Sequence, residues 1–302
     1  MSRPITVAAA QLGANQETAS RQEIADRLMA LLDRAVGEGV QLLVYPELAL
    51  TTYFPKKVRD RSEYDGFYDS KLPTAETEQL FQRARDAGVA FHLGYAERSP
   101  EGTYFNSSVY VDADGEIAGR YRKIHLPGRT AHTTKSDRPV VYEPLYFAHG
   151  DLGLRSFPTK LANVGLFLCQ DRRYPEVYRT LGLAGAEIAL TGYNTPVYPL
   201  ALDHNELTLR AGAYENSMFV IAAAKAGVED GVPFIGGTCV IDPNGQVLAR
   251  AHGSGDELVT ARVDLDWVDE ARASWNFYGR RHPGEYASLT APVQAPETKS
   301  VF

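Results

Sequence analysis

The stretch NVGLFLCQDRRYPE (163–176) decides the fold class, because an apolar run gives way to charged residues at one position. Gly165 to Leu168 read as a buried strand, which Cys169 ends, and Gln170-Asp171-Arg172-Arg173 follow at once. The carboxyl end of a strand is where α/β sheets present functional groups. The stretch therefore predicts an α/β protein with Cys169 at a functional edge.

Strand-like and helix-like segments alternate on both sides of this stretch. The first helix, 18–39, carries one apolar face, formed by Ile24, Leu28, Leu31, Leu32 and Ala35. The other expected helices are 75–87, 175–184, 204–215 and 266–275. The expected strands are 5–12, 40–47, 89–97, 104–112, 116–123, 164–170, 186–194, 217–227 and 258–265, and 237–250 is expected to form two strands joined by a turn.

This alternation is satisfied by two β-rich layers covered by helices on both sides, a four-layer α-β-β-α sandwich. Turn signals at Asp114-Gly115 and Asn244-Gly245 hint at pseudo-symmetric halves. The segments 51–75 and 127–160 read as long loops around a site. We expect one domain over 1–302, with a core of 1–275 and a tail of 276–302 that is a candidate for contact between subunits.

Composition excludes several classes of function. The chain of 302 residues has a net charge of −7, which argues against non-specific binding to nucleic acid or to a membrane surface. No run approaches the ~20 apolar residues of a membrane helix. The two cysteines, Cys169 and Cys239, exclude a disulfide framework, and we expect a cytoplasmic protein with reduced thiols. Cys239 reads as a core residue of a strand.

Cys169 can be a buried structural thiol or a nucleophile. The nearby arginines would favour the thiolate, which attacks carbonyl carbon. No histidine has a telling position as its base, but Glu47 ends a strand apolar enough to desolvate a carboxylate and raise its pKa. Lys123 ends another strand, where an ammonium can stabilise an oxyanion. Glu47 can equally be a solvated loop carboxylate, and Lys123 a solvated strand edge.

Together these three residues match an ordered set of motifs. PELALTTYFP (46–55), YRKIHLPG (121–128) and CQDRRYPE (169–176) resemble the Glu–Lys–Cys motifs of the nitrilase superfamily, the carbon–nitrogen hydrolases. The resemblance runs from the first strand to about Leu265. The wording of these motifs, with GYNTP (192–196), is most similar to the N-carbamoyl-D-amino acid hydrolase branch.

The resemblance implies a role for each matching residue. Glu47 is the expected general base, Lys123 the oxyanion-stabilising cation, Cys169 the nucleophile, and Glu143 a second glutamate that orients the lysine. No metal or organic cofactor is implied, and the superfamily usually forms homo-oligomers, here a dimer or tetramer. The residues expected to bind substrate are Arg172, Arg173, Asn194, His125 and His204. One arginine is expected to bind the substrate and the other to be structural.

Three departures from that branch leave the substrate open. The chain after Asn194 is shorter than expected, Val141 stands where a histidine is expected, and Gln170 replaces an asparagine beside the nucleophile. Asp203-His204 suggests a metal ligand pair, but no further ligands fall at suitable spacing.

The sequence thus predicts a cysteine hydrolase of N-carbamoyl-amino acids, forming a thiocarbamoyl intermediate. The first alternative is an amidase or ureido-acid hydrolase of the same superfamily. A nitrilase fits the lysine and cysteine motifs less well, and a glutamine-amide transferase would need a fused synthetase domain. The alternative from another class is a non-catalytic interaction protein on this fold.

Overall fold

Two six-stranded sheets face each other in the structure, a computed structural model that describes residues 2–128 and 141–292. The first sheet has the order β14-β1-β2-β3-β4-β5 and the second β13-β12-β9-β8-β7-β6. The bounds of the first sheet are β1 (Pro4–Gln11), β2 (Leu42–Val44), β3 (Ala90–Arg98), β4 (Tyr104–Val111), β5 (Ile117–Arg122) and β14 (Glu257–Asp264). Those of the second are β6 (Ser156–Pro158), β7 (Asn163–Leu168), β8 (Ile188–Tyr193), β9 (Phe219–Ala224), β12 (Cys239–Ile241) and β13 (Val247–Arg250).

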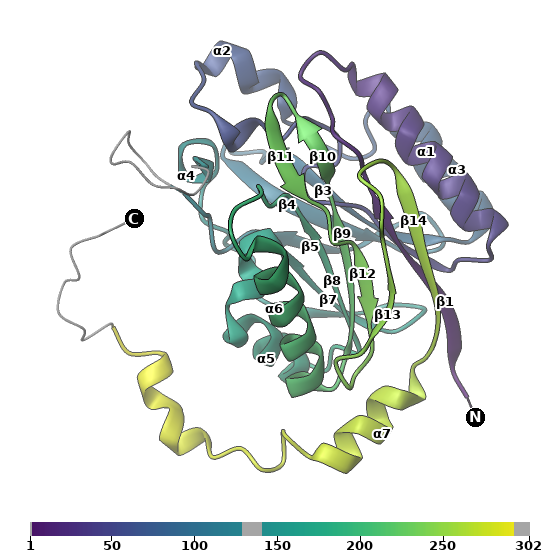
Figure 1. The fold of residues 1–302 in the computed structure, drawn as a ribbon, viewed down its shortest axis with the longest axis vertical. Helices are drawn as coiled ribbons and strands as arrows, with labels where there is room; N and C mark the ends of the chain where they lie inside the picture. The colour runs from purple at the N-terminus through teal and green to yellow at the C-terminus, as the bar shows by residue number, and fades with distance from the viewer. Residues whose placement is uncertain (1, 129–140, 293–302) are drawn as a thin grey trace.

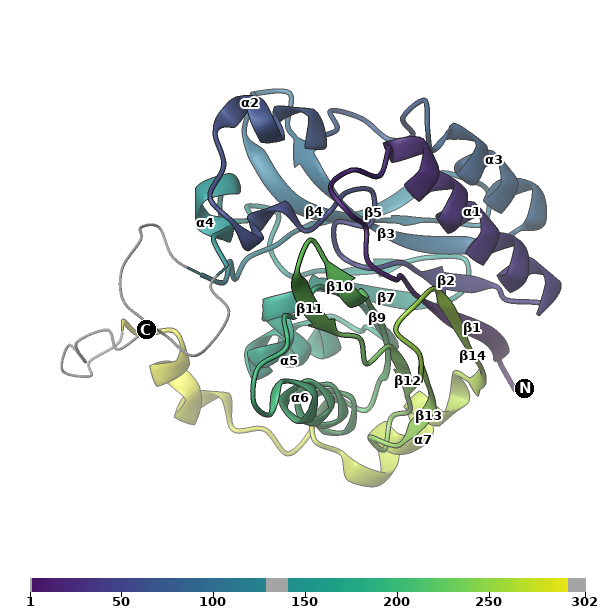
Figure 2. The ribbon, with the colours of Figure 1, turned by 45° about the horizontal axis from the view of Figure 1, so that its top comes forward.

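Helices cover the outer face of each sheet (Figures 1 and 2). α1 (Arg21–Gly37) and α3 (Glu78–Ala87) pack on the first sheet, and α5 (Pro175–Leu183) and α6 (Ala201–Asn216) on the second. α1 begins with a capping box between Ser20 and Glu23. The apolar face predicted for this helix is buried. The predicted four-layer α-β-β-α arrangement is confirmed.

The inner faces of the two sheets form the core. Its members come from both halves of the chain and include Val7, Val44, Leu166 and Ile221, all fully buried. The two sheets also share a pattern: β1-β2-β3 and β7-β8-β9 are parallel, and each run continues into antiparallel strands. Parallel strands of one sheet end at the same edge, and β2 of the first sheet packs against β8 of the second, so the residues after these two strands meet.

Several boundaries differ from the sequence prediction. The predicted loop 51–75 contains η1 (Phe54–Lys56), α2 (Arg61–Tyr64) and η2 (Asp65–Phe67), and the segment 127–160 contains α4 (Glu143–Tyr146) and β6. The strand predicted to run to 227 ends at Ala224, and a separate hairpin follows, formed by β10 (Ala226–Glu229) and β11 (Val232–Ile235). The sequence prediction missed this hairpin, although Asp230-Gly231 is a turn signal.

The chain leaves the sandwich at its C-terminal end. α7 (Asp266–Trp275) is followed by an arm with η4 (Pro283–Leu289), which Figure 1 shows running along the outside of the body. Most residues between 276 and 292 are exposed, and 293–302 lie outside the described residues. The contact between subunits expected for this tail stays a prediction. Within the described chain, helices are too short or too polar to cross a membrane.

Candidate active site

Four side chains from separate elements meet between the two sheets: Glu47, Lys123, Glu143 and Cys169, here called the reactive cluster. Glu47 follows β2, Lys123 follows β5, Glu143 begins α4, and Cys169 follows β7. All four are buried. The sequence prediction placed these residues at strand ends or in a loop, and the fold brings them together.

Two glycines let the backbone of Glu47 enter this space. A Cβ atom on Gly192 of β8 would lie 2.2 Å from the amide nitrogen of Glu47, and one on Gly94 of β3 would lie 2.7 Å from its Cα. A side chain at either position would push Glu47 away. The next residue, Leu48, adopts a φ of 46°, so the chain turns sharply after the carboxylate.

Both carboxylate oxygens of Glu47 accept hydrogen bonds. Oε1 accepts from Lys123 Nζ at 2.6 Å and from Asn106 Nδ2 at 2.8 Å. Oε2 accepts from the backbone N–H of Asn194 at 3.1 Å and from its Nδ2 at 3.2 Å. The solvated loop carboxylate that the sequence left open is thereby ruled out, because Glu47 is fully buried and held by groups from three other elements.

Lys123 lies between two carboxylates. Its Nζ donates to Glu47 Oε1 at 2.6 Å and to Glu143 Oε1 at 2.8 Å, and all three side chains are inaccessible to solvent. Burial lowers the pKa of Lys123, but the negative charges of Cys169, Glu143 and Glu47 outweigh it and raise that pKa above its ordinary value. Lys123 is therefore a permanent cation and not a solvated strand edge.

Glu143 has only part of one cation, because it shares the ammonium of Lys123 with Glu47. Burial raises the pKa of Glu143 to about 7, against the attraction of Lys123 and with the help of the Glu47 charge. Its Oε1 also accepts from the hydroxyl of Tyr53 at 2.6 Å. Tyr53 is a member of the site that sequence reasoning missed.

Cys169 is the first residue of η3 (Cys169–Arg173) and has a φ of 43°, the left-handed region. Its Sγ lies 3.8 Å from the carbonyl oxygen of Asn194, the residue that also binds Glu47. The sequence prediction expected the arginines to favour the thiolate. Instead, burial and then the charge of Glu47 raise the pKa of the Cys169 thiol, and Lys123 and Arg172 offset this only in part.

The two adjacent arginines have different environments. Arg172 is 1% exposed; it donates to the carbonyl oxygen of Cys169 at 2.6 Å and to Thr195 Oγ1 at 2.7 Å, and it stacks on the ring of Tyr193. Arg173 is half-buried and donates to the hydroxyl of Tyr198 at 2.6 Å. Arg172 thus holds the turn that carries Cys169, whereas Arg173 lies where an approaching molecule can reach it.

The other predicted binding residues are divided between the cluster and the surface. Asn194 joins Glu47 to Cys169. His125 donates its backbone N–H to Asp171 Oδ1 at 3.0 Å, and its Nδ1 lies 2.7 Å from the same oxygen; its ring stacks on Tyr174. His204 is exposed on α6 and is not brought to the reactive cluster.

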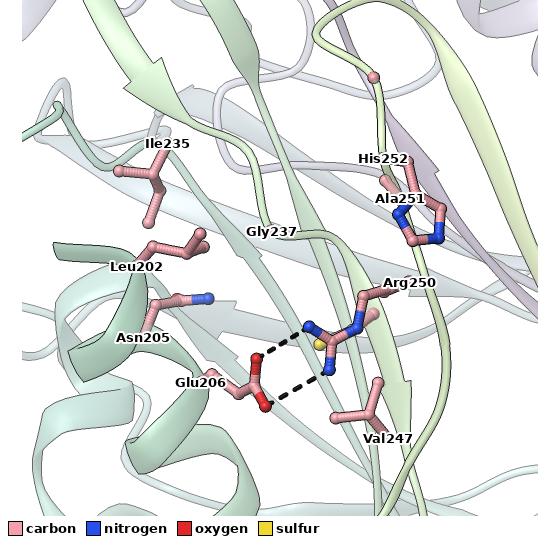
Figure 3. Close-up of a pocket in the computed structure, with 11 residues that line it drawn as sticks. Leu202, Asn205, Glu206, Ile235, Gly237, Val247, Arg250, Ala251 and His252 are labelled. Atoms are coloured by element: carbon pink, nitrogen blue, oxygen red, sulfur yellow. Dashed lines mark hydrogen bonds and ion pairs between the residues drawn. The ribbon is translucent and has the colours of Figure 1, made fainter. Parts of the chain in front are cut away.

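A cavity of about 170 Å³ lies beside β12 and β13, apart from the reactive cluster (Figure 3). Its wall includes Cys239, which is 5% exposed, and an ion pair between Glu206 and Arg250. The predicted core position of Cys239 is confirmed. Among residues 2–128 and 141–292, no group of three or more His, Cys, Asp or Glu side chains is arranged to hold a metal ion.

The arrangement supplies the parts of covalent hydrolysis. A thiol, a carboxylate that can accept its proton, and a fixed ammonium lie together between the two sheets. A neutral thiol beside a carboxylate suits proton transfer at the moment of attack, since the raised pKa keeps the sulfur protonated until then.

Comparison with known proteins agrees with this chemistry. The carbon-nitrogen hydrolase family model matches residues 6–273. N-carbamoylputrescine amidase of Arabidopsis thaliana is 27% identical, with 95% of each chain covered, and a citrullinase of Francisella tularensis is 29% identical, covering 94% of this chain and 98% of that one. The crystal structure of a carbon-nitrogen hydrolase from Helicobacter pylori G27 has a TM-score of 0.85 at 26% identity, covering 96% of this chain and 99% of that one.

Proposed function

The chain belongs to the carbon–nitrogen hydrolase family, and we propose that it hydrolyses N-carbamoyl-amino acids to the amino acid, carbon dioxide and ammonia. The observation that supports the chemistry is the buried contact set that joins Glu47, Lys123 and Glu143 and that Asn194 extends to Cys169. The N-carbamoyl class is supported by the relatives, whose names include N-carbamoylputrescine and citrulline, both bearing a terminal ureido group.

In the proposed first half-reaction, Glu47 takes the proton of Cys169 as the sulfur adds to the ureido carbon. Lys123 holds the oxyanion with an N–H that its contacts to the two described carboxylates leave available. Glu47 returns the proton to the leaving nitrogen, and ammonia departs. The C–N bond is then broken and a carbamoyl thioester remains on Cys169.

In the second half-reaction, water attacks the thioester and gives up a proton to Glu47. The sulfur leaves as the thiol, taking that proton, and a carbamate is released, which decomposes to the amino acid and carbon dioxide. Glu143 orients Lys123 through its 2.8 Å contact, and its own position is fixed by Tyr53. Because the same carboxylate serves both halves, the mechanism needs one base.

Arg173 is the proposed partner of the substrate carboxylate. It lies four residues after the nucleophile on η3, is half-buried, and has a planar guanidinium suited to two parallel hydrogen bonds. Arg172 is the proposed structural arginine, since it is buried and donates to the carbonyl oxygen of Cys169 and to Thr195 Oγ1. Preference for the D form, suggested by the motif wording, stays a prediction, since the relatives described above have other names.

The second candidate is a ureido compound with a cationic end. The N-carbamoylputrescine amidase at 27% identity favours it. If Arg173 binds a substrate carboxylate, its positive guanidinium would repel the positive end of this second substrate. Arg173→Gln therefore separates the two: KM for N-carbamoyl-amino acids rises, whereas KM for a cationic ureido compound falls or is unchanged.

Ammonia release tests the proposal. The panel comprises N-carbamoyl-D- and L-amino acids, citrulline, N-carbamoylputrescine, simple amides and nitriles. Cys169→Ala is expected to lower turnover by at least about 10⁴-fold. Cys239→Ala is the matched control, because the other thiol lies in the wall of the separate cavity, and it should leave turnover unchanged.

Each other outcome changes the proposal. Release from simple amides alone would favour an amidase over a ureido hydrolase, and release from nitriles would favour a nitrilase. Undiminished turnover by Cys169→Ala would refute the covalent mechanism. A well-folded protein that releases ammonia from none of these compounds would favour an interaction protein on this fold.

A further inference from the structure

The segment from Glu47 to Tyr53 enters the reactive cluster at both ends. At its start Glu47 binds Lys123 at 2.6 Å, and at its end the hydroxyl of Tyr53 donates to Glu143 at 2.6 Å. Because Lys123 also binds Glu143, the segment closes a ring of contacts around the ammonium. The shape of these seven residues therefore sets the spacing between the two carboxylates.

A carboxylate from the other half of the chain holds the C-terminal part of this segment. Glu229, the last residue of β10, is fully buried. Its Oε1 accepts the backbone N–H of Tyr53 and, at 2.8 Å, the hydroxyl of Thr52. Its Oε2 accepts the backbone N–H of Asn15 at 2.9 Å, and the side chain of Asn15 in turn donates to the carbonyl oxygen of Thr51 at 3.1 Å.

Two lysines neutralise Glu229 and add their own contacts to the segment. Lys225 Nζ lies 3.4 Å from Glu229 Oε2 and donates to the carbonyl oxygen of Thr51 at 2.6 Å. Lys56 Nζ lies 3.2 Å from Glu229 Oε1 and 2.6 Å from Asp230 Oδ2. Glu229, Lys225, Lys56 and Asp230 are here called the Glu229 cluster.

The Glu229 cluster is aimed at the segment and has no place in the mechanism above. A buried ion group costs desolvation energy, and a hydrophobic replacement is often more stable. Three consecutive residues, Thr51, Thr52 and Tyr53, are nonetheless bound by it through backbone groups as well as side chains. Stability alone does not account for a charged group directed at the backbone before Tyr53.

We propose that Glu229 is a positioning residue for the hydrolysis: it fixes residues 51–53 so that Tyr53 reaches Glu143 and the Glu47–Lys123–Glu143 contacts form. The inference deepens the proposed function and rests on it wherever catalytic rates are the readout. Glu229 acts through Tyr53 and touches no reacting atom.

The first test is Glu229→Gln with Asp230→Asn as its matched control. Gln keeps the size of the side chain but cannot accept from Tyr53, Thr52 and Asn15 together while holding two lysines. We expect kcat to fall about 10-fold with KM unchanged within about twofold. Asp230 shares Lys56 and Thr52 with Glu229 but not Tyr53 or Lys225, so Asp230→Asn should keep the wild-type kcat. An unchanged kcat in folded Glu229→Gln would overturn the inference.

A double-mutant cycle tests the route through Tyr53. Tyr53→Phe removes the hydroxyl that binds Glu143 and should lower kcat by about 10-fold on its own. If Glu229 acts through this hydroxyl, adding Glu229→Gln to Tyr53→Phe should lower kcat by less than about threefold more. Fully multiplicative losses would show that Glu229 acts elsewhere and would overturn the inference.

Thiol alkylation separates this inference from the proposed function. The rate of iodoacetamide reaction with Cys169, with Cys169→Ala as the baseline for Cys239, needs no substrate. We expect Glu229→Gln to slow it by a factor similar to the fall in kcat, because the base and cation around the sulfur lose their spacing. A wild-type protein inactive on the whole panel would refute the proposed function, and this rate would still support or overturn the role of Glu229.

Glu229→Asp carries the test if the Gln variant does not fold. Asp keeps the charge for the lysines but is one methylene too short to reach both Tyr53 and Asn15. We expect a kcat between those of the wild type and Glu229→Gln, with KM unchanged. A lower melting temperature with wild-type kcat and alkylation rate would show a purely structural role and overturn the inference.

Discussion

Glu143 and Glu229 are both buried glutamates beside a lysine, yet their pKa values move in opposite directions. Burial raises the pKa of Glu143 to about 7, and the single nearby cation, Lys123, is shared with Glu47. Burial also acts to raise the pKa of Glu229, but Lys225, Lys56 and two backbone N–H groups outweigh it and hold that pKa below its usual range.

The difference shows that the protein uses buried charge in two ways. The reactive cluster carries the proposed chemistry, and the Glu229 cluster binds the backbone of residues 51–53. In the reactive cluster two carboxylates and a thiol share one ammonium, and the pKa of one of them, Glu143, lies at about 7. In the Glu229 cluster two ammonium groups face two carboxylates, and the pKa values of Glu229 and Asp230 are held below their usual range. Glu143 and Glu229 are both fully buried, and the ratio of cations to acids around them distinguishes the two clusters.

The largest expected difference between the two clusters is in kcat, when a glutamate of each is replaced by glutamine. Glu47→Gln should lower kcat by about 10³-fold, because the proposed base is lost, whereas Glu229→Gln should lower it only about 10-fold. Ammonia release under saturating substrate measures both. Equal losses would erase the distinction between a reacting and a holding carboxylate.

The lysines should differ in stability. Lys123→Met leaves Glu47 and Glu143 buried without their cation and should cost about 3–5 kcal/mol of unfolding free energy. Lys225→Met should cost less, because Lys56 remains 3.2 Å from Glu229. Urea unfolding of the two variants measures the difference. A Lys225→Met variant as unstable as Lys123→Met would show that Lys56 alone does not stabilise the charge of Glu229.

A glycine in each region tests how closely the backbone is packed. Gly192→Ala brings a methyl group to 2.2 Å from the Glu47 nitrogen and should cost about 1–3 kcal/mol, with lower activity. Gly231, in the hairpin beside Glu229, has open space and a φ of +82°, so Gly231→Ala should cost about 1–2 kcal/mol through backbone strain alone. Melting temperatures and ammonia release check both. A loss of activity in Gly231→Ala but not in Gly192→Ala would reverse the comparison.

The two glutamates also differ in the pH dependence of stability that each contributes. The folded pKa of Glu143 lies above the unfolded value of about 4.3, so its contribution is full at pH below the unfolded pKa and is lost as pH rises through about 7. The lowered pKa of Glu229 gives a contribution present above about pH 4.3 and lost as pH falls through its folded pKa.

Urea unfolding at several pH values tests these signs. Glu143→Gln should remove a loss of stability that the wild type shows between about pH 4 and 7. Glu229→Gln should remove a loss below about pH 4. A Glu143→Gln variant whose stability falls as steeply as that of the wild type would contradict the assignment.

The sequence was sufficient for the layers and for the residues at strand ends. Apolar runs predicted most strands, and Glu47, Lys123 and Cys169 stood out because each breaks such a run. Glu143 was found only through the resemblance, since it lies on the four-residue α4 beyond a loop. The common edge of one sheet accounts only for Glu47 and Lys123, and the packing of the second sheet on the first brings Cys169 to them.

The rest of the site depends on contacts between residues far apart in the chain, which no sequence pattern indicates. Asn106 is a polar residue within a strand, and its role follows only from the 2.8 Å contact with Glu47. Tyr53 lies in a segment that reads as loop, and Asp171 looked like part of a charged run but accepts from His125 and Tyr121 in the core. Arg172 lowers the pKa of Cys169 as the sequence predicted, but the burial of the sulfur and the charge of Glu47 outweigh it, and both are properties of the folded chain.

Mass spectrometry of the acid-quenched enzyme tests the central claim most directly, that the sulfur at the end of β7 attacks the substrate carbon. During turnover of an N-carbamoyl-amino acid, the peptide containing Cys169 should carry the mass of the substrate less ammonia, and the peptide containing Cys239 should not. An enzyme that turns over with both cysteine peptides unmodified, and equally fast when Cys169 is alanine, would contradict the account.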